Sequence, residues 1–343
     1  MKKYNVAVVG ANGAVGEEIL RVLEEIDFPI NKLIPLASAR SVGKTVEYNG
    51  EEHAIIELTN DVFAQHEVEI ALFSAGGSVS AEFAPDAVRA GAVVIDNTSH
   101  FRMQDDVPLV VPEVNPQDIA LWQQTGVIAN PNCSTIQMVQ ALKPLDDAYD
   151  ITRVDVATYQ ATSGAGKSAM EELVTQMQAF FAFTLDEAEH KAFNQQIALN
   201  VIPQIDIFMD NGYTKEEMKM VNETSKIMHK NIPLSATCVR VPVLRGHSEA
   251  LTVTFDSEVE ADEARALLAK APNIVILDNP DEALYPMPAT CVDKNETFVG
   301  RIRNDNFSKN MLHFFVVADN LRVGAATNAV RIAQKWVEME GDK

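Results

Sequence analysis

The segment GANGAVG at residues 10–16 constrains the fold more than any other stretch of the chain. It follows YNVAVV, an apolar run typical of a buried parallel strand, and precedes EEILRVLEEI, whose periodicity predicts an amphipathic helix. Glycines at this junction let the backbone turn tightly and approach a pyrophosphate at the helix N-terminus. A tight turn without a ligand is the alternative. We expect a dinucleotide site that includes Gly10, Ala11, Asn12, Gly13, Ala14, Val15 and Gly16.

The order of apolar runs predicts two domains, as does a length of 343 residues. LIPLAS, EIALFSA, AVVID and PLVVP alternate with helical or polar connections, which favours a Rossmann-type doubly wound parallel sheet. Beyond residue 151, the runs TRVDVATYQA, CVRVPVL, EALTVTF and FFVVADNL favour an α+β domain with a largely antiparallel sheet. We expect the domains to span 1–129 and 130–322, with a C-terminal helix, 323–343, that packs back on the first.

The composition excludes several classes of protein. A net charge of -21 opposes binding to nucleic acid or to anionic membranes. No apolar run approaches the roughly 20 residues of a membrane span, and the apolar stretch near the start is too short for a signal peptide. The three cysteines suggest neither a disulfide framework nor a metal site. We expect a cytoplasmic protein without a metal.

The form of the dinucleotide is indicated by the segment after the second strand. A site for NAD usually has an acidic residue there, which binds the ribose hydroxyl. This chain has LASARSVGK instead. Ser38 and Arg40 are suited to bind and neutralise a 2′-phosphate, which favours NADP, although a solvated loop arginine is the alternative. The same crevice is expected to include Ser41, Ser74, Gly76 and Gly77.

The segment NPNCST indicates a reactive thiol. Proline makes the preceding residue extended, and Asn132 is a good N-cap for a helix that begins near Cys133. A helix N-terminus stabilises a thiolate, so the pKa of a thiol placed there can fall below about 8.5. A small buried residue in a capped turn is the alternative. Cys238 and Cys291 lack such a setting, and for them packing is expected.

A cysteine nucleophile needs a proton carrier, and His247 is the best placed of the histidines. It follows an apparent strand, in the bend RGHSE. The segment GAGKS at residues 164–168 suggests an ATP-binding loop, but Ala161 occupies the position where that motif requires its first glycine. Ser163 and Gly164 are therefore interpreted as a flexible turn whose backbone approaches a ligand, and we expect both to contact the cofactor.

Many segments along nearly the whole chain together resemble aspartate-β-semialdehyde dehydrogenase. They are GANGAVG, SARS, RMQDDVPLVVPEVN, NPNCST, YQATSGAGK, EEMKMVNETSKI, RVPVLRGHSE and NLRVGAATNAV. The resemblance implies NADPH-dependent reductive dephosphorylation of aspartyl 4-phosphate to aspartate 4-semialdehyde, on the route to lysine, threonine and methionine. It also implies a homodimer formed through the second domain.

The resemblance assigns a role to individual residues. Cys133 matches the nucleophile that forms a thioester, His247 the acid/base, and Gln160 the residue that orients the acyl intermediate. Asn132 matches a neighbour of the nucleophile near the phosphate site. The remaining substrate contacts are Arg240 for the α-carboxylate, Glu216 for the ammonium group, and Arg102 and Lys219 for phosphate, with Asn328 near the nicotinamide. From spacing alone, Glu216 and Lys219 are an ordinary solvated ion pair.

The sequence leaves two other functions open, N-acetylglutamyl-phosphate reductase and a non-catalytic NADP-binding sensor, and argues against a third. N-acetylglutamyl-phosphate reductase has similar chemistry, but its nucleophile usually lies in a Gly-Cys-Tyr type segment. Glyceraldehyde-phosphate dehydrogenase typically has SCTTN, which this chain lacks. A non-catalytic NADP-binding sensor needs neither Cys133 nor His247.

Overall fold

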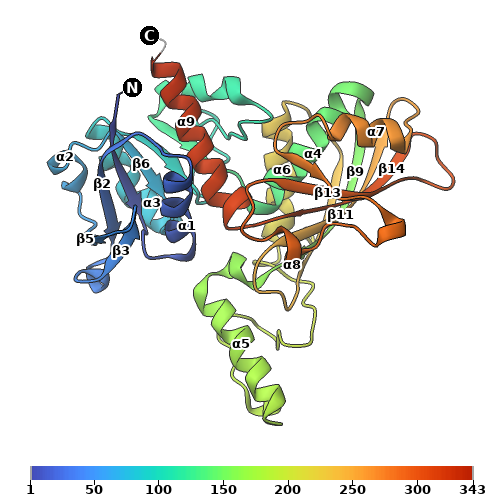
Figure 1. The fold of residues 1–343 in the computed structure, drawn as a ribbon, viewed down its shortest axis with the longest axis horizontal. Helices are drawn as coiled ribbons and strands as arrows, with labels where there is room; N and C mark the ends of the chain where they lie inside the picture. The colour runs from blue at the N-terminus through green and yellow to red at the C-terminus, as the bar shows by residue number, and fades with distance from the viewer. Residues whose placement is uncertain (1, 342–343) are drawn as a thin grey trace. The chain divides into compact units, whose positions relative to one another are not determined.

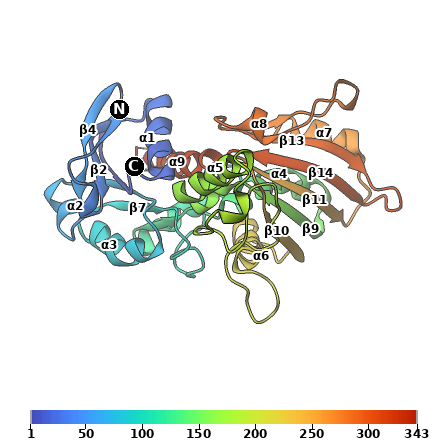
Figure 2. The same ribbon diagram turned by 90° about the horizontal axis from the view of Figure 1, so that it is seen from below.

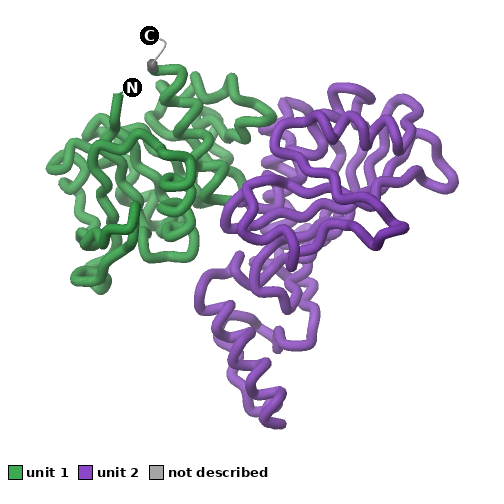
Figure 3. Tube along the Cα trace, in the orientation of Figure 1, with its two compact units in different colours: residues 1–132, 325–343 green, residues 133–324 purple. Residues whose placement is uncertain are grey.

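The computed structural model describes residues 2–341 and divides them into two compact units (Figure 3). Unit 1 contains residues up to Asn132 together with the segment from Ala325 onward, and unit 2 contains Cys133–Gly324. Each unit has its own six-stranded sheet. The chain therefore leaves unit 1 directly before the thiol predicted to be reactive and returns to it near the C-terminus.

Unit 1 is built on a sheet in which all paired strands are parallel. The strands follow the order β5-β2-β1-β6-β7-β8. Their bounds are β1 Tyr4–Val9, β2 Ile30–Ala37, β5 Ile56–Glu57, β6 Ile70–Phe73, β7 Val93–Asp96 and β8 Val127–Ala129. The order reverses on either side of β1, so the sheet is doubly wound, and the predicted Rossmann-type fold is confirmed.

Helices and a small hairpin complete unit 1 (Figure 1). The elements are α1 Ala14–Glu25, α2 Val62–Gln65, α3 Gly77–Arg89, α9 Thr327–Gly341, the 3₁₀ turns η1 Ala39–Ser41 and η2 Pro116–Gln124, and the hairpin β3 Thr45–Tyr48 with β4 Glu51–Ala54. The last helix contributes to the core, because Trp336 of α9 packs edge-on against Tyr4 of β1 and against Trp122.

Unit 2 has a mixed sheet with strand order β10-β9-β11-β14-β13-β12 (Figure 2). The strands are β9 Ile151–Gln160, β10 Leu234–Arg240, β11 His247–Phe255, β12 Ile274–Ile276, β13 Thr297–Asn304 and β14 Met311–Ala318. The helices are α4 Cys133–Tyr149, α5 Lys167–Phe181, α6 Lys215–Met228, α7 Ala261–Leu268 and α8 Pro288–Cys291. The short helical turns are η3 Thr162–Ala165, η4 Leu185–Glu187, η5 Pro280–Glu282 and η6 Arg322–Ala326. The last two residues of η6 belong to unit 1. The first and longest helix, α4, packs against α6, α7 and the sheet.

The largely antiparallel sheet predicted for unit 2 is confirmed, because β11 pairs antiparallel with β9 and β14, and β13 pairs antiparallel with β14. The sheet is mixed, since β9 pairs with β10 and β12 with β13 in parallel. The long connection from β9 to β10 through α5 and α6 is what a parallel pair requires. One expectation about strands is wrong. The run PLVVP is not a strand: Leu109 makes one isolated bridge to Ala129, and the flanking prolines lack the N–H groups that a ladder needs.

The structure also bears on membrane insertion. Within residues 2–341, every helix is too short or too polar to cross a bilayer.

Candidate active site

The sheet of unit 2 brings three predicted residues to one edge. Strands β9 and β10 run parallel and end at Gln160 and Arg240, whereas the antiparallel strand β11 begins at His247. All three side chains are buried, and Gln160 and Arg240 each directly follow a more exposed neighbour along their strands. Polar side chains at these positions are costly unless they are paired, which indicates a site with a chemical role.

Cys133 is the first residue of α4, as predicted, and it is half-buried and forms no disulfide with the other cysteines of residues 2–341. The helix dipole favours a negative charge at this position. The next residue, Ser134, accepts a hydrogen bond from Nε2 of Gln160, which ties the first turn of α4 to the end of β9. Arg240 also interacts electrostatically with Cys133, and this interaction favours the thiolate.

A glycine makes room for the thiol. A Cβ atom placed on Gly324 would lie 2.6 Å from Cβ of Cys133 and 3.0 Å from its Cα. Cβ atoms do not approach each other so closely, so position 324 must lack a side chain for Cys133 to keep its place. Sequence reasoning missed this residue, since a glycine before a helix is common and nothing local indicates its contact with Cys133.

The imidazole of His247 has a defined orientation. Its Nδ1 accepts a hydrogen bond from the backbone N–H of Ala161 at 3.0 Å, so the neutral ring carries its proton on Nε2. Burial, together with the positive charge of Arg240, lowers the pKa of His247 to about 3, although Glu216 opposes this shift. Nε2 has no hydrogen-bond partner among residues 2–341. The ring is therefore a neutral N–H donor.

The turn η3 lies against His247 and Arg240. A Cβ atom on Gly164 would lie 3.0 Å from one terminal nitrogen of Arg240 and 3.2 Å from Nε2 of His247. Ser163, predicted to contact the cofactor, is buried and exchanges hydrogen bonds with Asn320 at 3.0 and 2.9 Å. Asn320 also accepts from the backbone N–H of Gly246 at 2.8 Å, which holds the bend before His247.

Helix α6 contributes Glu216 and Lys219 to the same site. A capping box between Thr214 and Glu217 starts the helix, and Glu217 also accepts from the backbone N–H of Cys238 on β10 at 3.0 Å. This anchoring places Glu216 within 3.1 Å of Nε2 of Gln160. Glu216 is 5% exposed. It is therefore part of the buried site and not half of a solvated surface pair.

Lys219 is held between two carboxylates. Its Nζ lies 3.1 Å from Glu216 and 2.9 Å from Asp206. Burial favours the neutral amine, but the two carboxylates outweigh it and raise the pKa of Lys219, so the side chain stays charged. Sequence reasoning missed Asp206, which belongs to an irregular segment without a motif.

The other predicted substrate residues belong to unit 1. Arg102 is buried, and its Nε and one terminal nitrogen donate to the backbone carbonyls of Asn130 and Asn97 at 2.9 and 2.7 Å. These bonds fix the plane of the guanidinium group. Asn132 is also buried and directly precedes the first residue of α4.

The glycine turn of unit 1 has the tight geometry expected of a nucleotide site. Gly10 has a φ of +87°, and a Cβ atom there would meet Ala75 at 3.1 Å. At Gly16 a Cβ atom would lie 2.1 Å from the carbonyl oxygen of Gly10, which excludes any side chain. Ala14 and Val15 open α1, so their backbone N–H groups belong to the helix end that attracts anions.

The remaining predicted cofactor residues gather near the same edge of the parallel sheet. Ser38, Arg40 and Ser41 follow β2, and Oγ of Ser41 accepts from the Asn12 side chain at 2.9 Å. Arg40 is exposed. Ser74 follows β6 and donates to the carbonyl of Val9 at 3.0 Å; Gly76 and Gly77 open α3. Carboxyl ends of parallel strands form the usual ligand edge of such sheets.

Asn328 lies near the start of α9, and its side chain is the last in a series of hydrogen-bonded amide groups. Its Nδ2 donates to Oδ1 of Asn130 at 2.6 Å and to the carbonyl of Val110 at 2.9 Å. Asn130 in turn donates to Asn97 at 3.0 Å. Oδ1 of Asn328 is buried and lacks a hydrogen-bond partner among residues 2–341, so it is available to an external donor.

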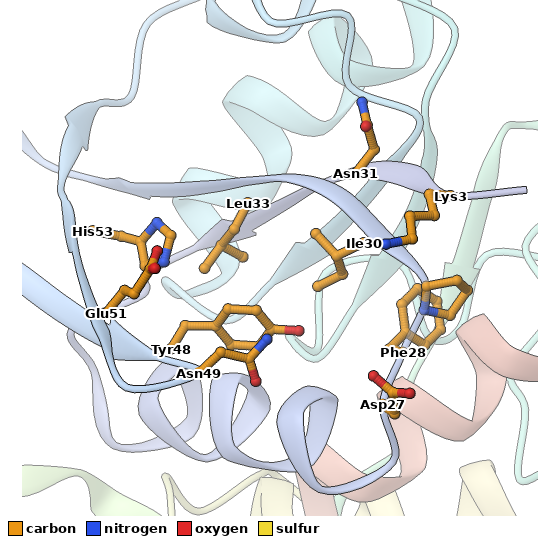
Figure 4. Close-up of a pocket in the computed structure, with 11 residues that line it drawn as sticks. Lys3, Asp27, Phe28, Ile30, Asn31, Leu33, Tyr48, Asn49, Glu51 and His53 are labelled. Carbon is orange, nitrogen blue, oxygen red and sulfur yellow. The ribbon is translucent and has the colours of Figure 1, made fainter.

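A hollow of about 470 Å³ occurs elsewhere in unit 1 (Figure 4). Its lining includes Lys3, Ile30 and Tyr48, which lie at or near the amino ends of β1 and β2 or in the adjoining hairpin. This is the sheet edge opposite to the glycine turn, and none of the predicted site residues lines it. In the described part of the chain, no group of three or more His, Cys, Asp or Glu residues is placed to hold a metal ion.

Known families match most of the chain. The family described as "Semialdehyde dehydrogenase, NAD binding domain" matches residues 5–122, and "Semialdehyde dehydrogenase, dimerisation domain" matches residues 142–323. An aspartate-semialdehyde dehydrogenase from Campylobacter jejuni is 62% identical over 339 residues, covering 99% of each chain. The chain belongs to the aspartate-semialdehyde dehydrogenase family.

Other members of the aspartate-semialdehyde dehydrogenase family agree with this assignment. One from Legionella pneumophila is 54% identical, covering 97% of this chain and 95% of the relative. A crystal structure titled aspartate semialdehyde dehydrogenase II complexed with ASA, from Vibrio cholerae, has a TM-score of 0.95 and 49% identity, covering 98% of this chain and 99% of that one. The family thus combines a nucleotide-binding unit with a second unit of the kind found here.

Proposed function

We propose that the protein converts L-aspartyl 4-phosphate to L-aspartate 4-semialdehyde by reductive dephosphorylation with NADPH. The observation that carries this proposal is the convergence of Cys133, Gln160, Glu216, Arg240 and His247 at one buried edge of unit 2. The similar Vibrio cholerae structure, which is complexed with ASA, supports the substrate class. The enzyme would serve the biosynthesis of lysine, threonine and methionine.

The first chemical step belongs to Cys133. Its thiolate attacks the acyl carbon of the substrate, and the bond from that carbon to the phosphate oxygen breaks. Phosphate leaves with the electron pair, and a thioester remains. The position at the start of α4, together with Arg240, stabilises the negative sulfur before the attack.

The neighbouring side chains bind and orient the substrate. Arg240 is suited to the α-carboxylate, because its planar guanidinium group offers paired donors. Glu216 is suited to the ammonium group, while Lys219 and Arg102 supply positive charge for the phosphate. Gln160 links Glu216 to the first turn of α4 and so relates the bound amino acid to the thiol.

His247 stabilises charge at the reacting oxygen. With Nδ1 engaged by Ala161, its Nε2–H is the donor that meets the developing oxyanion. If this proton passes to that oxygen, the ring is left as an imidazolate, which must then regain a proton from solvent; in this sense His247 acts as the acid of the reaction. When bound, NADPH supplies the hydride that reduces the thioester carbon.

The residues of unit 1 fit this cofactor. The tight turn Gly10–Gly16 leads into the N-terminus of α1, the kind of helix end that binds a pyrophosphate. Oδ1 of Asn328 is a buried acceptor without a partner in the described chain, as a carboxamide N–H₂ group requires. We propose NADP over NAD because Ser38 and Arg40 follow β2, where an NAD site usually has an acid. Ser163 and Gly164 of unit 2 remain proposed cofactor contacts.

Two further properties belong to the proposal. We expect a homodimer formed through unit 2, because residues 142–323 match a dimerisation domain. Cytoplasmic localisation stays a prediction that cell fractionation tests. We also expect the two domains predicted from the sequence to separate functionally into nucleotide binding and chemistry.

The deciding assay runs the reaction in reverse. Aspartate semialdehyde, phosphate and NADP should give NADPH absorbance at 340 nm with the wild-type protein and none with Cys133→Ser. Activity confined to the N-acetylglutamate semialdehyde would favour N-acetylglutamyl-phosphate reductase instead. Cofactor binding without turnover of either aldehyde would favour a non-catalytic sensor.

A further inference from the structure

Glu249 is a buried acid that the reaction above does not use. It lies on β11 two residues after His247, so both side chains project from the same face of the sheet. Its exposure is 0%, and neither carboxyl oxygen completes a hydrogen bond with residues 2–341. An ionised carboxylate in such a place would cost several kcal/mol. Burial raises the pKa of Glu249 well above its ordinary value, which favours the uncharged form of the group.

Gln137 connects this acid to the helix that carries the thiol. It lies four residues after Cys133 on α4, which places it one turn further along the same side of the helix. Its Nε2 donates to the backbone carbonyl of His247 at 3.5 Å, a long hydrogen bond. Its side chain also lies against Glu249 and partly offsets the effect of burial on the pKa of that acid.

Two polar atoms around Glu249 also lack hydrogen-bond partners in the described chain. They are Oε1 of Gln137 and Oγ1 of Thr158, which lies directly across from Glu249 on β9. A protonated Glu249 can donate its O–H to either oxygen, and the Thr158 hydroxyl can in turn donate to the carboxyl group. Among the nearby titratable groups, His247 has a lowered pKa and so favours the neutral ring, and Cys238 is a buried thiol, which has no positive form. Neither group therefore supplies a positive charge that would stabilise an ionised Glu249.

We propose that Glu249 and Gln137 are a pair of positioning residues, which hold the first turns of α4, and with them Cys133, against the strand that carries His247. This inference rests on the proposed roles of Cys133 and His247. Neither residue of the pair touches the reacting atoms. The pair acts through the backbone carbonyl of His247 and through the helix that begins at the thiol.

The test compares variants of Glu249 that differ only in polarity. Glu249→Gln keeps an uncharged group with a donor and an acceptor, and kcat should stay within about threefold of wild type. Glu249→Leu removes both, and kcat should fall about 10- to 100-fold while KM for the aldehyde and the affinity for NADP change little, as expected for misplaced reacting groups. Gln137→Leu tests the same pair from the helix and should reproduce the effect, even if Glu249→Leu does not fold.

A second readout does not depend on turnover. The rate at which iodoacetamide alkylates Cys133 should change its pH profile in Glu249→Leu and Gln137→Leu but not in Glu249→Gln. Thr297→Val is the matched control, because Thr297 donates to Gln140 of α4 at 2.6 Å, away from the first turn. It should lower stability without changing the alkylation profile.

The outcomes separate this inference from the proposed function. Full activity and an unchanged alkylation profile in Gln137→Leu and in folded Glu249→Leu would overturn the positioning role. Equal losses in Glu249→Gln and Glu249→Leu would overturn the uncharged state, since the glutamine differs from the neutral acid only slightly. If the wild type lacks the semialdehyde activity, the proposed function fails, but alkylation of Cys133 still decides whether the pair positions the thiol.

Discussion

The backbone N–H of Ala161 donates to Nδ1 of His247 at 3.0 Å, and this bond determines which nitrogen of the ring carries the proton. Asparagine at position 247 can replace part of the ring's polarity but cannot transfer a proton. We expect His247→Asn to lower kcat by about 10²- to 10⁴-fold, the range typical of a lost general acid or base. Steady-state kinetics with both substrates measure the effect, and a loss smaller than about tenfold would remove His247 from the chemistry.

The buried imidazole should also affect stability as a function of pH. Its pKa is lowered in the folded protein from 6.5 to about 3, so the unfolded chain takes up a proton first as the pH falls. This group's contribution to stability is therefore present above pH 6.5 and is lost as the pH falls toward about 3. Urea unfolding of wild type and His247→Asn should show free-energy curves that converge or cross with falling pH. Parallel curves would contradict the buried neutral ring.

Cys133 is expected to be essential for turnover but not for cofactor binding. Cys133→Ser should abolish most activity, because an alcohol is a far weaker nucleophile than a thiolate at neutral pH. The affinity for NADP should be nearly unchanged, since its proposed contacts involve other residues. Fluorescence titration with the nucleotide provides the control for folding. Undiminished turnover would refute the assignment.

Gly324 is expected to be required for the position of the thiol. A methyl group there would lie 2.6 Å from Cβ of Cys133, so Gly324→Ala must move either α4 or the segment around residue 324. We expect kcat to fall about 10- to 100-fold. Gly91→Ala is the control, because it introduces strain at a φ of +96° but meets no atom within 4 Å. Equal effects of both changes on activity would show that the contact with Cys133 is unimportant.

Arg40 is expected to distinguish the two nucleotides. Arg40→Ala should weaken binding of NADP much more than binding of NAD, because only NADP carries the 2′-phosphate. Arg21→Ala is a suitable control, since Arg21 is another exposed arginine of unit 1 and pairs with Glu18 at 2.8 Å. Isothermal titration with both nucleotides measures the difference. A similar loss of affinity for the two would contradict a phosphate contact by Arg40.

Local patterns in the sequence predicted local structure well. The strand before Gly10 and the helix that begins at Cys133 both follow from turn chemistry and periodicity within a few residues. Likewise, the strand that ends at Gln160 was expected from its β-branched and aromatic residues.

Relationships between distant segments could not be predicted in the same way. The parallel pairing of β9 with β10 depends on a long crossover, and the run at Leu109 looks like a strand but is flanked by prolines. The burial of Glu216 follows from the anchoring of α6 on β10. The contact of Gly324 with Cys133 joins residues from nearly opposite ends of unit 2. A short stretch of the sequence contains no pattern that indicates any of these contacts.

Helix α9 has a consequence for how the protein is made. Six residues of the core of unit 1 are translated only after the whole of unit 2: Ala326, Ala329, Val330, Ile332, Ala333 and Trp336. A ribosome therefore releases all of Cys133–Gly324 before the nucleotide-binding unit has its complete interior. Unit 1 begins before unit 2 along the message but is completed after it, so its nascent form keeps apolar side chains uncovered until α9 has been translated.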